Sequence, residues 1–92
     1  MLSIKFFPDS DLRDFSGAIG EYEEIWATDG ERIIKTWIDF TGCQFQETVI
    51  TAIVHDLKST SHPLALRSSA LLDRKKSSLI HELGHRLLSQ QM

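Results

Sequence analysis

The sequence has one cysteine, two prolines and no long run of apolar residues. Because Cys43 has no second cysteine to pair with, an intramolecular disulfide is excluded, and a reducing compartment is the simpler expectation. No stretch approaches the roughly 20 apolar residues of a membrane-spanning helix, and the amino terminus lacks the basic and apolar segments of a signal peptide. We therefore expect a cytoplasmic protein without a membrane partner.

Basic residues are also few. Ten Lys and Arg stand against thirteen Asp and Glu, so the formal net charge is -3. A nucleic-acid-binding surface needs basic residues gathered on one face, and we expect no nucleic-acid partner. The composition is otherwise that of a globular chain, with 41% hydrophobic and 25% charged residues. A chain of 92 residues is long enough for one small hydrophobic core, so residues 1–92 are predicted to form a single domain.

The chain begins with a strand pattern and continues with a helix pattern. Apolar side chains alternate imperfectly over residues 2–7, which predicts a strand with one face on a core. Beyond it, apolar residues recur every three or four positions in two nearly in-phase sets. They predict either one helix over residues 11–41 or two helices that meet at Asp29 and Gly30.

The ends of this helical region carry capping residues. Residues 9–11 offer Asp and Ser side chains for the amino-terminal cap, and Gly42 is able to adopt the left-handed conformation of a carboxyl-terminal cap. Trp26 and Trp37 lie at helical spacing, and the burial preference of tryptophan favours the core over an aromatic ligand site for both.

The strongest strand signal covers residues 46–57, which are rich in β-branched side chains. Ile50, Ala52 and Val54 share one face of this strand. The other face also carries apolar residues, so we expect the strand to lie inside a sheet with partial cover on both sides.

Two shorter segments follow. Residues 58–62 are expected to form a polar loop. Residues 63–67 predict a short strand, placed at a sheet edge because Pro63 is tolerated there. An extended peptide could add to such an edge as a further strand, which matters for the function considered below.

The most informative stretch is residues 77–88, which contains the pattern His-Glu-x-x-His. On a helix this spacing places His81 and His85 one turn apart on one face, where two neutral imidazole nitrogens can hold one zinc ion. Glu82 lies beside that face and could take a proton from a metal-activated water. The alternative is a surface helix with two incidental histidines and a salt-bridged glutamate. A helix is indicated by apolar residues at helical spacing, Leu79, Ile80, Leu83 and Leu87.

The sequence also suggests where this helix starts and what lies against it. Asp73 is the best amino-terminal cap. Lys75 and Lys76 are unfavourable in a first turn because of the helix dipole, so the start could be as late as Ser77. Gly84 lies between the two histidines and costs helix stability, but it would let a strand or a bound peptide come close.

At residues 79–85 the sequence resembles the active-site helix of the zincin metallopeptidases. The resemblance implies that His81 and His85 are zinc ligands and that Glu82 is the catalytic glutamate. The order of helix, strands and motif helix is also similar to the small gluzincin-like peptidases called minigluzincins. We accordingly expect an α+β fold with a small, mostly antiparallel or mixed sheet. One or two amino-terminal helices and the carboxyl-terminal motif helix would pack on one face of that sheet.

The third zinc ligand of the zincins is missing from its expected positions. A catalytic zinc normally has three protein ligands and an open position for water. The metzincin continuation would need Gly at position 88 and His at position 91, where this chain has Leu88 and Gln91. No following helix carries a glutamate. Three explanations stay open: a fragment of a longer enzyme, which we favour, a ligand from upstream or from another subunit, or an inactive site.

The sequence thus predicts a zinc-dependent peptidase, or its catalytic core, acting on an extended peptide or protein substrate. The alternatives are a non-catalytic zincin-like binding or regulatory module, and a structural metal site shared between two chains, which would leave no open position for water. The oligomeric state is not predicted. Further candidates, each with an ordinary structural explanation, are His55, His62 and Cys43 as ligands and Asp73, Arg67 and Arg86 as residues of a substrate channel.

Overall fold

The computed structural model describes residues 2–10, 14–61, 64–69 and 71–89. These residues form, in chain order, β1 (Ser3–Pro8), α1 (Ser16–Thr41), β2 (Val49–His55), β3 (Thr60–Ser61), β4 (Leu64–Arg67) and α2 (Leu72–Ser89). The strands make one sheet in the order β1-β2-β4-β3. β1, β2 and β4 are parallel and β3 is antiparallel to β4, so the predicted α+β class with a mixed sheet is confirmed.

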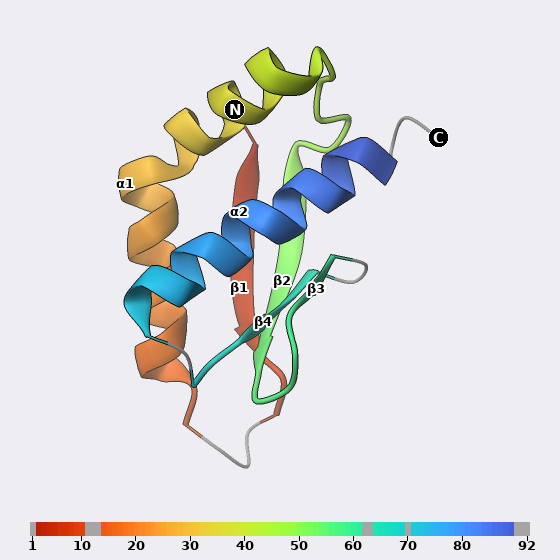
Figure 1. Cartoon of the computed structure of the whole chain (residues 1–92). Coiled ribbons are helices and arrows are strands. Elements are labelled where there is room, and N and C mark those ends of the chain that lie inside the picture. The colour runs from red at the N-terminus through yellow and green to blue at the C-terminus, as the bar shows by residue number, and fades with distance from the viewer. Residues whose placement is uncertain (1, 11–13, 62–63, 70, 90–92) are drawn as a thin grey trace.

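Both helices lie on one face of the sheet, as the sequence predicts (Figure 1). The face beneath them carries the buried side chains of Ile4, Ile50, Ala52, Val54, Leu64 and Leu66, and Ala65 of β4, on the opposite face by strand alternation, is also buried. The opposite face of β2 carries Val49, which is 49% exposed, and Thr51, which is also exposed. The predicted cover on both sides of this strand is therefore wrong at these positions, and the described residues form two layers.

α1 is one continuous helix, which decides between the two alternatives for this region. It passes through Gly30, where an added Cβ would lie 2.8 Å from the Trp26 ring, so the glycine lets that indole lie along the helix. Trp26 is 8% exposed, and Trp37 is partly buried against the core, in agreement with the sequence. The helix ends as predicted, because Gly42 has φ 72° and its N–H donates to the Ile38 carbonyl.

The start of α1 differs from the prediction. The helix begins at Ser16 and not near residue 11, and Phe15 at the cap position makes no side-chain cap hydrogen bond. Asp14 instead accepts hydrogen bonds from the backbone nitrogen of Ser16 at 2.9 Å and from its hydroxyl at 2.6 Å. Of the expected caps, residues 9 and 10 lie before the helix and residue 11 is outside the described residues.

The sheet edge also lies elsewhere than predicted. β4 pairs with β2 on one side and with β3 on the other, so it is an internal strand. The edge strand on this side of the sheet is β3, which falls in the segment where a loop is predicted, and β1 forms the other edge. β3 lies beside α2, because the Arg86 guanidinium on α2 donates a hydrogen bond to the Ser61 carbonyl (Figure 1). Pro63 lies outside the described residues.

α2 begins at Leu72, so Asp73 is its second residue and not its cap, and a start at Ser77 is wrong. The first turn tolerates Lys75 because this side chain is buried, with its Nζ 2.7 Å from a carboxylate oxygen of Glu21 on α1. The core face of the helix is as predicted, with fully buried Leu79, Leu83 and Leu87. In the described part of the chain, neither this helix nor α1 contains an apolar stretch that could cross a membrane.

Candidate metal centre

His81 and His85 lie next to each other on α2, on the side opposite its buried leucines. Both side chains are exposed. Their Nε2 atoms are 3.0 Å apart, and the ring centroids are 4.4 Å apart with the ring planes nearly perpendicular at 80°. One nitrogen of each imidazole therefore lies within hydrogen-bonding distance of the other on the exposed side of the helix.

The spacing of these nitrogens can be compared with what zinc needs. Zn–N bonds of about 2.0–2.1 Å at a tetrahedral angle place two ligand nitrogens about 3.3–3.4 Å apart. The observed 3.0 Å is slightly shorter, and a small rotation of either exposed ring would open it. A hydrogen bond at this distance needs one nitrogen as donor and the other as acceptor, because neutral imidazole offers one of each. For both nitrogens to bind one cation, the donor ring would have to carry its hydrogen on Nδ1 instead, and with that change the pair fits part of a zinc site.

The described residues supply only these two ligands. Within them, no group of three or more His, Cys, Asp or Glu side chains is placed to hold a metal ion. His55 lies on the uncovered face of the sheet, with its Nε2 3.2 Å from the Lys58 carbonyl oxygen. Cys43 follows the cap of α1, with its Sγ 3.7 Å from the Thr41 carbonyl oxygen. His62 lies outside the described residues.

Glu82 is half-buried and lines a surface hollow together with His81. The hollow has a volume of about 580 Å³ and lies between the first half of α2 and the segments that follow β2 and β4. Among the described residues Glu82 forms no ion pair, so the alternative of a salt-bridged surface glutamate has no support. The carboxylate is thus open toward the same side of the helix as one of the histidines.

Basic residues dominate the charge of this hollow. Lys58, Arg67 and Arg74 line it together with four serines, and Glu82 is the acidic residue of the wall. The sequence identifies Arg67 as a channel candidate, and the structure places it here. The sequence does not identify Lys58 and Arg74 as candidates, because the three cations come from three separate segments without a common spacing. Asp73, a second channel candidate, lies on α2 and lines a different hollow.

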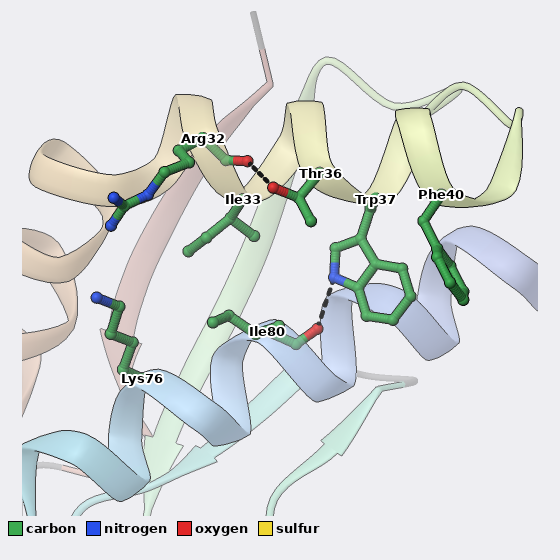
Figure 2. A pocket seen from close by; sticks show the side chains of 7 residues that line it. All are labelled: Arg32, Ile33, Thr36, Trp37, Phe40, Lys76 and Ile80. Carbon is green, nitrogen blue, oxygen red and sulfur yellow. Dashed lines mark hydrogen bonds between the residues drawn. The ribbon is translucent and has the colours of Figure 1, made fainter.

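Gly84 has a different neighbour from the one expected. A Cβ at this position would overlap the six-membered ring of Trp37 on α1, so the glycine admits an indole and neither a strand nor a peptide. The Trp37 Nε1 donates a hydrogen bond of 3.0 Å to the Ile80 carbonyl, one turn before Gly84 (Figure 2). The turn of α2 that carries the histidines is therefore fixed against α1 by both packing and a hydrogen bond.

The seam between the helices opens beside Trp37 into a second hollow of about 370 Å³ (Figure 2). Its lining is apolar at Ile33, Phe40 and Ile80, with the side chains of Arg32 and Lys76 at one end. Both of these cations pair with Asp29. Neither histidine nor Glu82 lines this hollow, so it is separate from the candidate metal centre.

Arg86, the third channel candidate, is engaged in a structural contact. Its guanidinium donates two hydrogen bonds, of 2.8 and 2.7 Å, to the two carboxylate oxygens of Glu47, and a third of 2.8 Å to the Ser61 carbonyl. Hydrogen bonding to Glu47 raises the pKa of Arg86 above its usual value. This residue follows His85 directly, so it ties the end of the motif to the edge strand β3 and to the segment before β2.

No family model, curated protein or solved structure matches this chain. The likeness to zincins therefore rests on the short motif, and the geometry around it has to carry the functional argument. That geometry consists of a paired set of imidazole nitrogens, an adjacent unpaired carboxylate in the described residues, and an open hollow beside them.

Proposed function

We propose that the chain is a zinc-dependent peptidase or the catalytic core of one, with His81 and His85 as metal ligands and Glu82 as general base. The observation that carries the proposal is the 3.0 Å approach of the two Nε2 atoms on an exposed helix face, with Glu82 lining an open hollow beside them. Incidental surface histidines need not direct their nitrogens at each other.

The chemistry follows from these residues. A bound zinc ion supplies a Lewis acid that polarises a carbonyl oxygen and makes water more acidic. The Glu82 carboxylate accepts a proton from the attacking water and returns it to the leaving amine. An extended substrate would lie in the hollow that His81 and Glu82 line.

A catalytic zinc also needs a third protein ligand. The described residues do not provide one, so the proposal requires it from outside them: from the rest of this sequence, from a longer chain or from a second chain. Zinc binding by the histidine pair is therefore tested separately from hydrolysis.

The first test combines zinc content with peptide hydrolysis for Glu82→Gln, which keeps the size of the side chain and removes the base. We expect zinc near one per chain in both proteins and a loss of hydrolysis of at least about 100-fold in the variant, the lower end of what a general base contributes. His81→Ala and His85→Ala should each lose zinc. Glu23→Gln, an exposed glutamate on α1, is the matched control and should change neither quantity.

Two results would count against this function. Purified protein that takes up no divalent metal would overturn the metal centre itself. Full hydrolysis by Glu82→Gln would remove the assigned role of the carboxylate.

A second function is favoured by the count of two ligands in the described residues. Two chains that each contribute their histidine pair would form a closed four-ligand site, which leaves no position for water and excludes hydrolysis. Half a zinc per chain together with a dimer that dissociates on dilution would support this structural site. Zinc at one per chain in a monomer would exclude it. Metal binding without hydrolysis of any peptide, in a monomer, would leave a binding or regulatory module.

A further inference from the structure

The Lys and Arg side chains fall into two groups, those that form an ion pair with a carboxylate and those that do not. Nine of the ten Lys and Arg lie in the described residues, and five of these nine pair with a carboxylate there: Arg32, Lys35, Lys75, Lys76 and Arg86. Of the remaining four, three line the hollow beside Glu82, namely Lys58, Arg67 and Arg74. Although the net charge of the chain is -3, three of the four described cations without a carboxylate partner thus lie in one concave place, and the fourth is Lys5 on β1.

None of these three side chains forms an ion pair with a carboxylate among the described residues, so their charges are free to interact with a ligand. The Arg67 Nε donates a hydrogen bond of 3.3 Å to the Ser69 hydroxyl, which is neutral and leaves the guanidinium charge without a counter-charge among the described residues. Lys58 and Arg74 are both exposed. Glu82 is the acidic residue of the lining, so three positive charges face one negative charge. A concave surface of this kind attracts anionic groups more strongly than a flat one, because its walls exclude part of the screening water.

We infer that this hollow binds acidic side chains of a peptide, so that the substrate of the proposed peptidase carries Asp or Glu near the bond that is cut. The cleavage half of this inference rests on the proposed function, and the binding half does not. A peptide fits better than a free anion because the hollow, at about 580 Å³, has room for several residues and is continuous with His81 and Glu82.

The spacing along α2 sets the expected position of the acidic residue. Arg74 precedes His81 by seven residues, which is about 10 Å along a helix that rises about 1.5 Å per residue. An extended peptide advances about 3.3 Å per residue, so about three residues separate a side chain at Arg74 from the backbone at the metal centre. The acidic preference should therefore be strongest about three positions from the cut bond.

The binding test uses fluorescence anisotropy with two labelled seven-residue peptides of equal length, one with three Glu and one with three Lys. The protein is the zinc-treated Glu82→Gln variant, so that no peptide is consumed. We expect the acidic peptide to bind at least about tenfold more tightly at low salt. This preference should shrink when the ionic strength rises from about 0.05 M to 0.5 M, because the charges are partly exposed to solvent.

The charge reversals Lys58→Glu and Arg74→Glu, made together, should abolish or invert that preference. Arg74→Glu suits the first turn of a helix, so loss of folding is not expected to intervene. Lys5→Glu, made in the same background on the uncovered face of the sheet, is the matched control and should leave the preference unchanged. Circular dichroism spectra of all variants show whether the fold is retained.

The hydrolysis test measures kcat/KM for a neutral peptide and for versions with Glu at each position in turn. A maximum about three residues from the cut bond, which disappears in the double charge reversal, would support the inference.

Hydrolysis without any preference for acidic residues would overturn the inference and leave the proposed peptidase activity in place. Tight binding of the acidic peptide without cleavage of any peptide would support the hollow and overturn the peptidase. Equal binding of the two labelled peptides would overturn the inference whatever the activity.

Discussion

Gly84 shows how one missing side chain positions the motif. The Trp37 ring occupies the space where a Cβ would be, and its Nε1 bonds to the Ile80 carbonyl of the same helix turn. The close contact that the glycine permits is therefore internal to the fold. Because it lies between the two histidines, it fixes their side of α2 relative to α1.

Gly84→Ala should destabilise the protein. Because the added Cβ would overlap a rigid indole ring, the overpacking cost should lie at the upper end of its usual range, at about 2–3 kcal/mol. The better helix propensity of Ala returns about 1 kcal/mol, so we expect a net loss of about 1–2 kcal/mol in the free energy of unfolding. Urea unfolding followed by circular dichroism measures it. Gly20→Ala, also in a helix and with nothing within 4 Å of the added Cβ, is the control and should stabilise by about 0.5–1 kcal/mol. Equal effects at both positions would show that the indole does not limit the site.

The histidines and cations near the candidate metal centre show which contacts between side chains can be predicted from the sequence. The contact between His81 and His85 can be predicted, because both residues lie on one helix and their spacing fixes their relative position. The burial of Lys75 cannot be predicted in this way, because its partner Glu21 is 54 positions away. Lys58 and Arg74 were missed for the same reason, since they meet across a hollow formed by separate segments.

Among the elements, α2 is held at both ends of its motif. Trp37 contacts the middle of the helix from α1, and Arg86 reaches from the end of the motif to Glu47 and to the carbonyl of Ser61. The Arg86 and Glu47 side chains are 16% and 31% exposed, so their pairing is only partly screened by solvent.

A double-mutant cycle on Arg86→Ala and Glu47→Ala should give a coupling energy of about 1–2 kcal/mol. Arg86→Lys should recover only part of it, because an ammonium group cannot form the two parallel hydrogen bonds. The matched control is the Lys35 and Asp39 pair on α1, with side chains 76% and 64% exposed, for which about 0.3–0.5 kcal/mol is expected. Chemical denaturation of the four proteins in each cycle supplies the values. A coupling energy no larger than that of the control pair would mean that the pairing of Arg86 with Glu47 does not anchor α2.

Local pattern predicted the elements better than their boundaries or neighbours. β2 is predicted because its β-branched residues alternate between a buried and an outer face. The apolar spacing predicts helix over the region of α1 but leaves open a break at Asp29 and Gly30, which the structure excludes. The two-residue strand β3 has no local signal, since it exists only through its pairing with β4. The helix start was misplaced because several acidic and hydroxyl residues precede α1, and only the fold shows that Asp14 makes the bonds to Ser16.

At the scale of the whole molecule, Tyr22 joins α1 to the sheet. It is fully buried, its hydroxyl donates a hydrogen bond of 2.7 Å to the Arg67 carbonyl, and its ring stacks on Phe6 of β1. Burial, with a smaller effect from the nearby Glu21 charge, raises the pKa of the Tyr22 phenol well above its ordinary value.

Because the folded state favours the neutral phenol, Tyr22 contributes stability that is complete below the unfolded pKa of about 10. That contribution falls as the pH rises from there toward the folded pKa, by about 1.4 kcal/mol per pH unit. Tyr22 is the one tyrosine of the sequence, so its ultraviolet tyrosinate signal is unambiguous. We expect this signal to appear together with the loss of helical circular dichroism, well above pH 10.

Tyr22→Phe serves as the control, since it removes the tyrosinate signal and leaves the unfolding transition to be followed by circular dichroism alone. Ionisation near pH 10 in a protein that keeps its helical spectrum would show that the phenol is accessible in the native state.

The two attachments of α2 have a thermodynamic consequence. Because an indole and a guanidinium already hold the helix in place, metal binding would need little ordering of the backbone that carries the two imidazoles. Little of the binding free energy would then be lost to ordering that backbone, so bound metal should raise the free energy of unfolding by close to the full amount that its affinity and concentration predict.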